Sequence, residues 1–338
     1  MKFGSVIESV AKATGGAMAR RITGSAPRIL MYHRFAEADT PRRLSQRLFE
    51  QHLDYLTRHF RVRRLSDVVE ALREGRPVEP RTVVLTVDDG YADFVEYAYP
   101  LLQKYEVPAT VFVVSDFLDR NSWLWTDAIR HALDTTTESR LVLTAHGVRL
   151  KHDLGVSSLR ERAWLAVCEL CLRAAPAERN SLIERLQQAL QVTMPLGATA
   201  DYRAMTWADA RRLDPDLVEI GSHTCTHPVL SRCSAPEIDH ELRESRRVIE
   251  QQLRRPISAI AYPHGEPADY DPRVVRAADA AGYRCAVVAH GGPIGEEVDL
   301  FRLERLSAAT EAMQFRSTVN GLELLANRFR AWRHAATF

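Results

Sequence analysis

The chain has 338 residues, of which 46% are apolar and 26% are charged, so we expect a globular protein with one large domain or one domain that carries a sizeable insertion. Lys and Arg number 45 and Asp and Glu 44, and the net charge of +1 excludes a global attraction to nucleic acid or an anionic membrane. The odd count of 5 cysteines does not predict a disulfide framework, and we interpret the C-x-x-C of Cys168 and Cys171 as packed thiols.

The N-terminal segment, residues 1–27, has no continuous apolar run followed by a small-residue cleavage site. We expect a short amphipathic helix there, ending near Gly24, which leaves peripheral contact with a membrane open. No stretch approaches the roughly 20 apolar residues that a membrane-spanning helix needs. We therefore expect a cytoplasmic protein, and the sequence does not indicate an oligomeric state.

Residues 28–338 are expected to form the main domain, in which short apolar runs alternate with helical patterns. The expected strands are residues 29–32, 60–65, 83–87, 108–114, 217–220, 257–262, 283–288 and 301–306. The expected helices are residues 44–58, 66–75, 93–105, 234–253 and 272–281, with a short helix after Thr206 and a C-terminal helix that ends near Trp332.

Capping signals mark three of these helices. Ser66 is expected to cap the second helix, and Thr206 with Asp209 and Ser234 with Glu237 have the form of capping boxes. The strand–helix alternation stops between about residues 119 and 205, where helical patterns at 128–133, 159–174 and 177–190 predict a mostly helical insertion beside or over the site.

Repeated strand–helix alternation implies an α/β fold of parallel strands joined by right-handed crossovers. Polar clusters follow several strands directly: His33, the pair Asp88 and Asp89, the pair His223 and His227, and residues 262–265. In a β/α barrel all of these would meet at the active face. A doubly wound open sheet is the alternative, but it would gather its site at one switch point and fits this scattered set less well.

The two acids and two histidines together are typical of a metal site. Adjacent buried carboxylates repel, so Asp88 and Asp89 need a cation or hydrogen bonds unless they form a solvated turn before Gly90. His223 and His227 are four residues apart, and Pro228 favours a tight loop or a single turn. Two imidazoles and one carboxylate, with positions open for water, form a common catalytic metal sphere, and the second acid is then free to act as a base.

Three segments resemble, in order, the motifs of polysaccharide deacetylases, the NodB-homology proteins of carbohydrate esterase family 4: TVDDG (86–90), HTCTHP (223–228) and YPHG (262–265). The resemblance covers about residues 29–306 without the insertion. It implies a distorted (β/α)7 barrel and metal-dependent removal of N- or O-acetyl groups from sugars. By motif, Asp88 corresponds to the general base and Asp89, His223 and His227 to the metal ligands, while His264 stands at the backbone N–H of the oxyanion hole.

Further assignments accompany this resemblance. We expect one divalent ion, zinc first, with nickel, cobalt and iron as alternatives. Tyr262 and Pro263 are assigned with His264 to the oxyanion and substrate side. Tyr91 is assigned to substrate contact or to the next helix start, and Cys225 is an alternative ligand.

The sequence departs from the family pattern in two places. The third family motif begins with an Arg that positions the base, but Ala261 stands here, so we expect Arg302 or Arg305 to replace it. The late family motif has a histidine that residues 301–306 lack. The early segment ending in His33 is similar to that of the poly-N-acetylglucosamine deacetylase subgroup, whose motif order is circularly permuted. We therefore assign the general acid to His33, with His290 and the His264 side chain as alternatives.

These assignments predict a metal-dependent hydrolase that removes an N-acetyl group from an amino sugar during glycan biosynthesis. The alternatives are a deformylase or deacetylase acting on a lipid- or nucleotide-linked sugar, and a catalytically silent glycan-binding barrel. Trp123 and Trp125, at the start of the insertion, are expected to stack on a sugar ring or to pack in the core. A helical lobe near the barrel mouth would favour a small or carrier-linked sugar.

Overall fold

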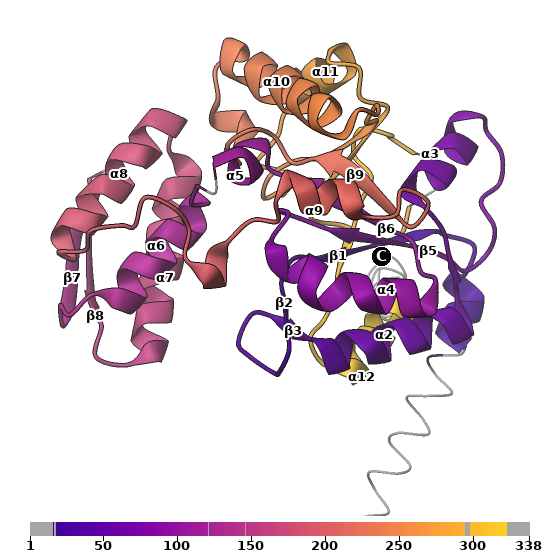
Figure 1. Cartoon of the computed structure of the whole chain (residues 1–338), viewed down its shortest axis with the longest axis horizontal. Coiled ribbons are helices and arrows are strands. Elements are labelled where there is room, and N and C mark those ends of the chain that lie inside the picture. Colours follow the sequence, from indigo (N-terminus) through magenta and orange to yellow (C-terminus); the bar gives the residue numbers. More distant parts are fainter. Residues whose placement is uncertain (1–15, 17, 121, 146, 295–297, 323–338) are drawn as a thin grey trace, which may run out of the picture.

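The computed structural model describes residues 16, 18–120, 122–145, 147–294 and 298–322 (Figure 1). Residues 18–23 are helical and the chain turns at Gly24, whereas the rest of the expected N-terminal helix and the C-terminal helix end near Trp332 lie outside the described residues. Among the described helices, none combines the length and the apolar composition that crossing a membrane requires.

A parallel sheet forms the centre of the molecule. Its strands lie in the order β11-β10-β9-β6-β5-β1-β12, and β4 pairs with β5 beside this path. Their bounds are β1 Arg28–Tyr32, β4 Arg61–Val62, β5 Thr82–Val87, β6 Ala109–Val113, β9 Val218–Ser222, β10 Ala259–Ala261, β11 Cys285–Val287 and β12 Leu306–Ser307. The strands from β5 to β11 follow one another in chain order, which is the arrangement of a barrel and not that of a doubly wound sheet.

The segment before and within β12 joins the two ends of the sheet. The N–H groups of Ala286 and Val288 donate to the carbonyls of Leu300 and Leu303 on one side. On the other side Leu306 pairs with Leu30 of β1 in parallel register. This irregular closure confirms the predicted distorted barrel of parallel strands.

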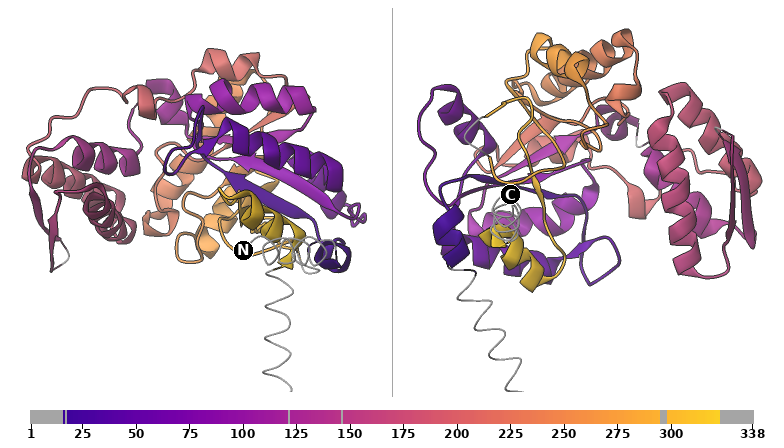
Figure 2. Two further views of the ribbon diagram at one scale, coloured as in Figure 1. Left: turned by 90° about the horizontal axis from the view of Figure 1, so that it is seen from below. Right: turned by 180° about the vertical axis from the view of Figure 1, so that it is seen from behind.

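Strands β1, β5, β6, β10 and β11 are buried along their whole length, and helices surround the sheet (Figures 1 and 2). All six side chains of β5 and all five of β6 are buried, as their continuous apolar, β-branched sequences predict. The surrounding helices are α2 Gln46–His59, α3 Leu65–Arg73, α4 Tyr99–Tyr105, α5 Ser115–Arg120, α9 Trp207–Arg212, α10 Ala235–Leu253, α11 Pro272–Ala280 and α12 Ala312–Asn320.

Local boundaries differ from prediction where short strands adjoin helices. The first two residues of the expected helix 44–58 instead form β3 (Leu44–Ser45), which pairs with β2 (Phe35–Ala36), and Ser45 caps α2. Helix α3 begins at Leu65 with Arg64 as its N-cap, so the expected cap at Ser66 is wrong. The backbone N–H of Ser66 donates to the Glu219 carboxylate. Both predicted capping boxes, at α9 and α10, are present.

The insertion forms a lobe beside the barrel (Figures 1 and 2). Its helices are α6 Trp125–Thr135, α7 Ser157–Arg173 and α8 Pro176–Ala189, and an unpredicted antiparallel hairpin of β7 (Arg140–Ala145) and β8 (Val148–Asp153) packs with them. The lobe has its own apolar core, which includes Cys168 and Cys171 as free thiols. The alternating burial of β7 is a strand pattern that the helical prediction overlooked.

Candidate metal centre

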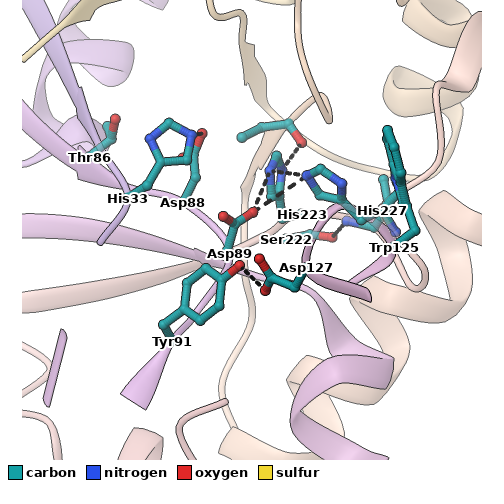
Figure 3. A network of polar contacts seen from close by, with 12 residues as sticks. His33, Thr86, Asp88, Asp89, Tyr91, Trp125, Asp127, Ser222, His223 and His227 are labelled. Atoms are coloured by element: carbon teal, nitrogen blue, oxygen red, sulfur yellow. Dashed lines mark hydrogen bonds and ion pairs between the residues drawn. The ribbon is translucent and has the colours of Figure 1, made fainter. Parts of the chain in front are cut away.

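The carboxyl ends of β5 and β9 bring Asp89, His223 and His227 together (Figure 3). Oδ1 of Asp89 lies 3.6 Å from Nε2 of His223 and 3.4 Å from Nε2 of His227. The two Nε2 atoms are 3.2 Å apart, and all three donor atoms lie within 4.8 Å of one another. The three predicted ligands therefore converge on one point from segments more than a hundred residues apart.

Backbone hydrogen bonding fixes the orientation of the His223 ring. Its Nδ1 lies 2.8 Å from the carbonyl oxygen of Ala261. A carbonyl only accepts a hydrogen bond, so Nδ1 carries the proton and the Nε2 lone pair faces Asp89 and His227. Ala261, which stands where the similar motif has an Arg, thus orients a candidate ligand through its backbone carbonyl.

Burial sets the protonation of this cluster. It lowers the pKa of His223 to about 4, and burial together with His223 and His264 holds the pKa of His227 well below its usual range. Burial and the neighbouring Asp88 raise the pKa of Asp89 well above its usual range. Two neutral imidazoles beside a buried carboxyl group form a donor set that suits a divalent ion.

The loops that carry these groups have strained backbones. The φ angles of Asp89, Thr224, His227 and His264 are 75°, 70°, 56° and 62°, in the left-handed region that non-glycine residues rarely adopt. Four such residues at one site indicate that the surrounding structure enforces this geometry, as is common at functional sites.

A buried ion pair holds the other acid. Arg305 donates to both oxygens of Asp88 at 2.7 Å, and its Nε donates to the carbonyl of Val288 at 2.9 Å. Burial alone would raise the pKa of Asp88, but Arg305 and His223 bring it down to about 2. The alternative Arg302 is wrong, because it is partly exposed and pairs with Asp299 at 3.5 Å.

His33 lies next to this pair, since β1 and β5 are neighbours in the sheet (Figure 3). Its Nε2 is 4.0 Å from Oδ2 of Asp88, and 46% of its side chain is exposed. Desolvation lowers the pKa of His33, while attraction to Asp88 opposes this shift. The rival His290 lies against Tyr270, with its Nε2 3.0 Å from the hydroxyl, and the His264 ring packs against that of His227 at 4.8 Å.

Two assigned side chains are not available to a substrate. Tyr262 has 0% exposure and its ring packs against Tyr270 at 5.2 Å, so its assignment to substrate contact is wrong for the side chain. Pro263 is also buried. The Tyr91 hydroxyl donates to Asp127 of the insertion at 2.6 Å, a contact that no local pattern indicates.

Comparison with known proteins decides the family. A family model described as polysaccharide deacetylase matches residues 75–286, a stretch that contains Asp88, Asp89, His223 and His227. The chain belongs to the polysaccharide deacetylase family.

Of two curated relatives of this polysaccharide deacetylase, one has low sequence identity and the other matches only a short stretch of the chain. The YxkH protein of Bacillus subtilis (strain 168), which carries the same family name, is 19% identical over 279 residues, covering 82% of this chain and 70% of YxkH. The poly-beta-1,6-N-acetyl-D-glucosamine N-deacetylase of Escherichia coli (strain K12) is 38% identical over 55 residues, which are 16% of this chain and 8% of that protein.

Solved structures share the fold of the polysaccharide deacetylase chain. The deacetylase PplD of Streptococcus pyogenes, solved with acetate, has a TM-score of 0.57 at 19% identity, covering 87% of this chain and 98% of PplD. IcaB of Ammonifex degensii has a TM-score of 0.58 at 15% identity, covering 88% and 98%. At such identities the likeness supports the barrel alone.

The sequence analysis did not predict the residue that holds the ligand loop, which is residues 223–228 with both histidines. Glu241 of α10 is buried and accepts hydrogen bonds from the N–H groups of Cys225 and Thr226, at 2.7 and 3.0 Å, and from the Thr226 hydroxyl at 2.6 Å. A glutamate on the apolar face of an amphipathic helix, one turn from Ile238, was the available signal. Cys225 is not among the converging donors, since its Sγ lies 3.6 Å from the Glu241 carbonyl oxygen.

The insertion also contacts the ligand loop. Trp125 is only 5% exposed, and its Nε1 donates to the carbonyl of His227 at 3.0 Å (Figure 3). Its ring lies 5.3 Å from that of His264. Trp125 therefore packs against the loop that carries both histidines and is not available to stack on a sugar. Trp123 is half-buried, packs against Tyr202 at 5.4 Å and donates to the carbonyl of Pro195.

Proposed function

We propose that this polysaccharide deacetylase is a metal-dependent hydrolase that removes the acetyl group from the nitrogen of an amino sugar. The observation that carries the proposal is the convergence of Asp89, His223 and His227 beside an Asp88 that Arg305 keeps ionised. Family membership supports deacetylation of a saccharide, and the geometry supports a hydrolytic mechanism with separate ligand and base carboxylates.

The donor set fits one divalent ion. Asp89, His223 and His227 would hold it, and the orientation of His223 by the Ala261 carbonyl favours coordination through Nε2. Zinc suits two imidazoles and a carboxylate, with nickel, cobalt or iron as alternatives. When bound, such an ion polarises a carbonyl and lowers the pKa of a water molecule from ~15.7 towards ~7.

Asp88 is the proposed base. Its pKa of about 2 keeps the carboxylate ionised at neutral pH, so it can accept the proton of the attacking water. The two hydrogen bonds from Arg305 fix both carboxylate oxygens, and they hold the carboxylate in one orientation.

His33 is the proposed acid, and the His264 backbone is the proposed oxyanion donor. An amide nitrogen leaves poorly as an anion, so a protonated His33 would deliver a proton to the departing amine. The His264 N–H would stabilise the negative charge that develops on the acetyl oxygen, an interaction worth roughly 3 kcal/mol. His33 suits its role because it is partly exposed and lies next to Asp88.

The proposed substrate is an N-acetylated amino sugar or an oligomer of it. The 55 residues shared with the Escherichia coli poly-beta-1,6-N-acetyl-D-glucosamine N-deacetylase support this class of substrate. A role in glycan biosynthesis and a cytoplasmic location stay predictions.

The test measures the metal content and acyl release of the purified protein. We expect about one divalent ion per chain, acetate release from N-acetylglucosamine oligomers, and loss of both in His223→Ala. Formate release from N-formyl sugars without acetate release would favour the deformylase. Full metal content in His223→Ala, or sugar binding without any acyl release, would overturn the proposal.

A further inference from the structure

The insertion contributes a carboxylate to the site that the proposed mechanism does not use. Asp127 of α6 lies beside Asp89 in Figure 3, and its Oδ2 accepts the 2.6 Å hydrogen bond from the Tyr91 hydroxyl. Its negative charge contributes to the raised pKa of Asp89, which is consistent with this proximity. Asp127 is nevertheless not one of the converging donors, so it lies beside the candidate metal position and not in it.

Tyr91 holds this carboxylate in a fixed orientation. The Tyr91 ring is 4% exposed, and the Arg34 guanidinium lies over it at 3.7 Å from the ring centre. Arg34 is itself fixed by a 2.6 Å hydrogen bond from its Nε to Asp93. A rigid aromatic donor therefore positions Asp127, and it does so from the loop that also carries Asp88 and Asp89.

The second carboxylate oxygen of Asp127 remains for a ligand. Within the described part of the chain, Oδ1 makes no hydrogen bond, and the residue is only half-buried. An ionised carboxylate accepts hydrogen bonds and donates none. The group that such an oxygen would recognise is a hydroxyl or another neutral donor, and it would repel an anionic substituent.

We propose that Asp127 is a substrate-contacting residue supplied by the insertion, whose Oδ1 accepts a hydrogen bond from a ring hydroxyl of the amino sugar. Tyr91 is the residue that positions it. This inference rests on the proposed function and names its substrate class more closely: a neutral N-acetylated hexosamine with a free hydroxyl near the acetamido group. A sugar that carries a carboxylate or phosphate at that place would be disfavoured.

The first test compares hydrolysis of a soluble N-acetylglucosamine oligomer with hydrolysis of p-nitrophenyl acetate, which has no sugar ring. Loss of a hydrogen bond to a charged group predicts that Asp127→Ala lowers the ratio of the two kcat/KM values by about 10- to 100-fold. Asp127→Asn, which keeps an acceptor oxygen, and Tyr91→Phe should lower it less. The matched control is Asp134→Asn on the same helix, where the exposed carboxylate pairs with Arg130.

Deoxy analogues of N-acetylglucosamine locate the hydroxyl. For the analogue that lacks the contacted hydroxyl, the wild-type kcat/KM should fall to the value that Asp127→Ala shows on the complete sugar. On that analogue, Asp127→Ala should have the same kcat/KM as the wild type. If Asp127→Ala lowers kcat/KM by the same factor on every analogue as on the complete sugar, Asp127 does not contact a hydroxyl.

A binding measurement on the metal-free protein gives a readout independent of turnover. By calorimetry, the Kd of the N-acetylglucosamine oligomer should rise by about 10-fold or more in Asp127→Ala and stay unchanged in Asp134→Asn. Equal Kd values and equal rate ratios in the wild type and Asp127→Ala would overturn the inference while leaving the proposed deacetylase intact. A wild type that neither hydrolyses nor binds the sugar would overturn the inference and the proposed function together. If Asp127→Ala does not fold, Asp127→Asn takes its place in these measurements.

Discussion

Asp88 and Arg305 form a fully buried ion pair, with side-chain exposures of 3% and 1%. Burying two charges costs several kcal/mol each, and attraction offsets this only when the remaining donors and acceptors are also satisfied. Arg305 meets that condition through its contacts with Val288 and Thr86. The pair therefore fixes the proposed base in place, and it also sets its pKa.

We predict that Arg305→Gln destabilises the protein by about 3–5 kcal/mol, because it leaves Asp88 buried without its cation. The pKa of Asp88, now held at about 2, should rise. Because activity needs ionised Asp88, the acidic limb of the pH profile should lie at a higher pH in this variant than in the wild type. Urea denaturation and the pH dependence of kcat/KM measure the two effects.

Arg302→Gln is the control for this variant, since Arg302 is partly exposed and pairs with Asp299 near the surface. Its effect on the free energy of unfolding should stay within about 0.5 kcal/mol. The pH dependence of the free energy of unfolding provides a further check on the wild type. Because folding depresses the Asp88 pKa from 3.8 to about 2, the contribution of the pair is present above pH 4 and is lost as the pH falls to 2.

His33 gives the second prediction at this scale. His33→Ala should reduce kcat by roughly 10²–10⁴-fold with the metal content unchanged, as expected for the loss of a proton donor. The wild-type rate should fall as the pH rises through the His33 pKa, which desolvation lowers from the ordinary 6.5, and this limb should be absent in the variant. If His290→Ala shows the loss and His33→Ala does not, the acid is His290.

At the scale of elements, α10 and the loop after β9 form one unit. Residues 223–228 place the two proposed histidine ligands on a strained backbone, and the Glu241 carboxylate accepts hydrogen bonds from the N–H groups between them. A loop with two left-handed residues would otherwise have many alternative conformations. The clamp from α10 explains how both imidazoles stay directed at Asp89.

We predict that Glu241→Gln weakens metal binding by about 10- to 100-fold, because residues that orient the ligands usually have effects of this size. The amide keeps an acceptor oxygen for the two backbone N–H groups but loses the negative charge and turns an NH2 group towards the Thr226 hydroxyl, so unfolding should become easier by about 1–3 kcal/mol. Competition with a chelator and thermal denaturation measure these losses. Glu244→Gln, on the same helix but paired with Arg247 near the surface, should change neither quantity.

Across the whole molecule, the proposed metal would join parts of the barrel that lie far apart in the chain. Asp89 follows β5, and both histidines follow β9, next to a lobe with its own apolar core. Trp125 and Asp127 connect that lobe to the site through His227 and Tyr91. Occupation of the site should therefore stabilise the entire fold.

We predict that free zinc at 100 times its Kd stabilises the folded protein by about 2.7 kcal/mol, measured as a rise in Tm that a chelator reverses. His223→Ala should show no such rise, because a ligand is missing. An equal rise in the wild type and in His223→Ala would place the zinc elsewhere on the protein.

The pattern of the sequence alone predicted the class of fold and the three side chains that converge at the candidate metal centre. Alternating strand and helix signals predict a barrel, and polar residues at strand ends predict its active face, because burial and periodicity are local properties of a segment. The acid pair and H-x-x-x-H are likewise read from neighbouring residues.

The tertiary structure decided which distant side chains support the site. Arg305 contacts Asp88 across 217 residues of chain, and nothing local distinguishes it from Arg302. Glu241 and Asp127 act through partners on other elements, 16 and 36 residues away. Such contacts depend on how helices and the insertion pack against the barrel, which the hydrophobic pattern of a single segment does not specify.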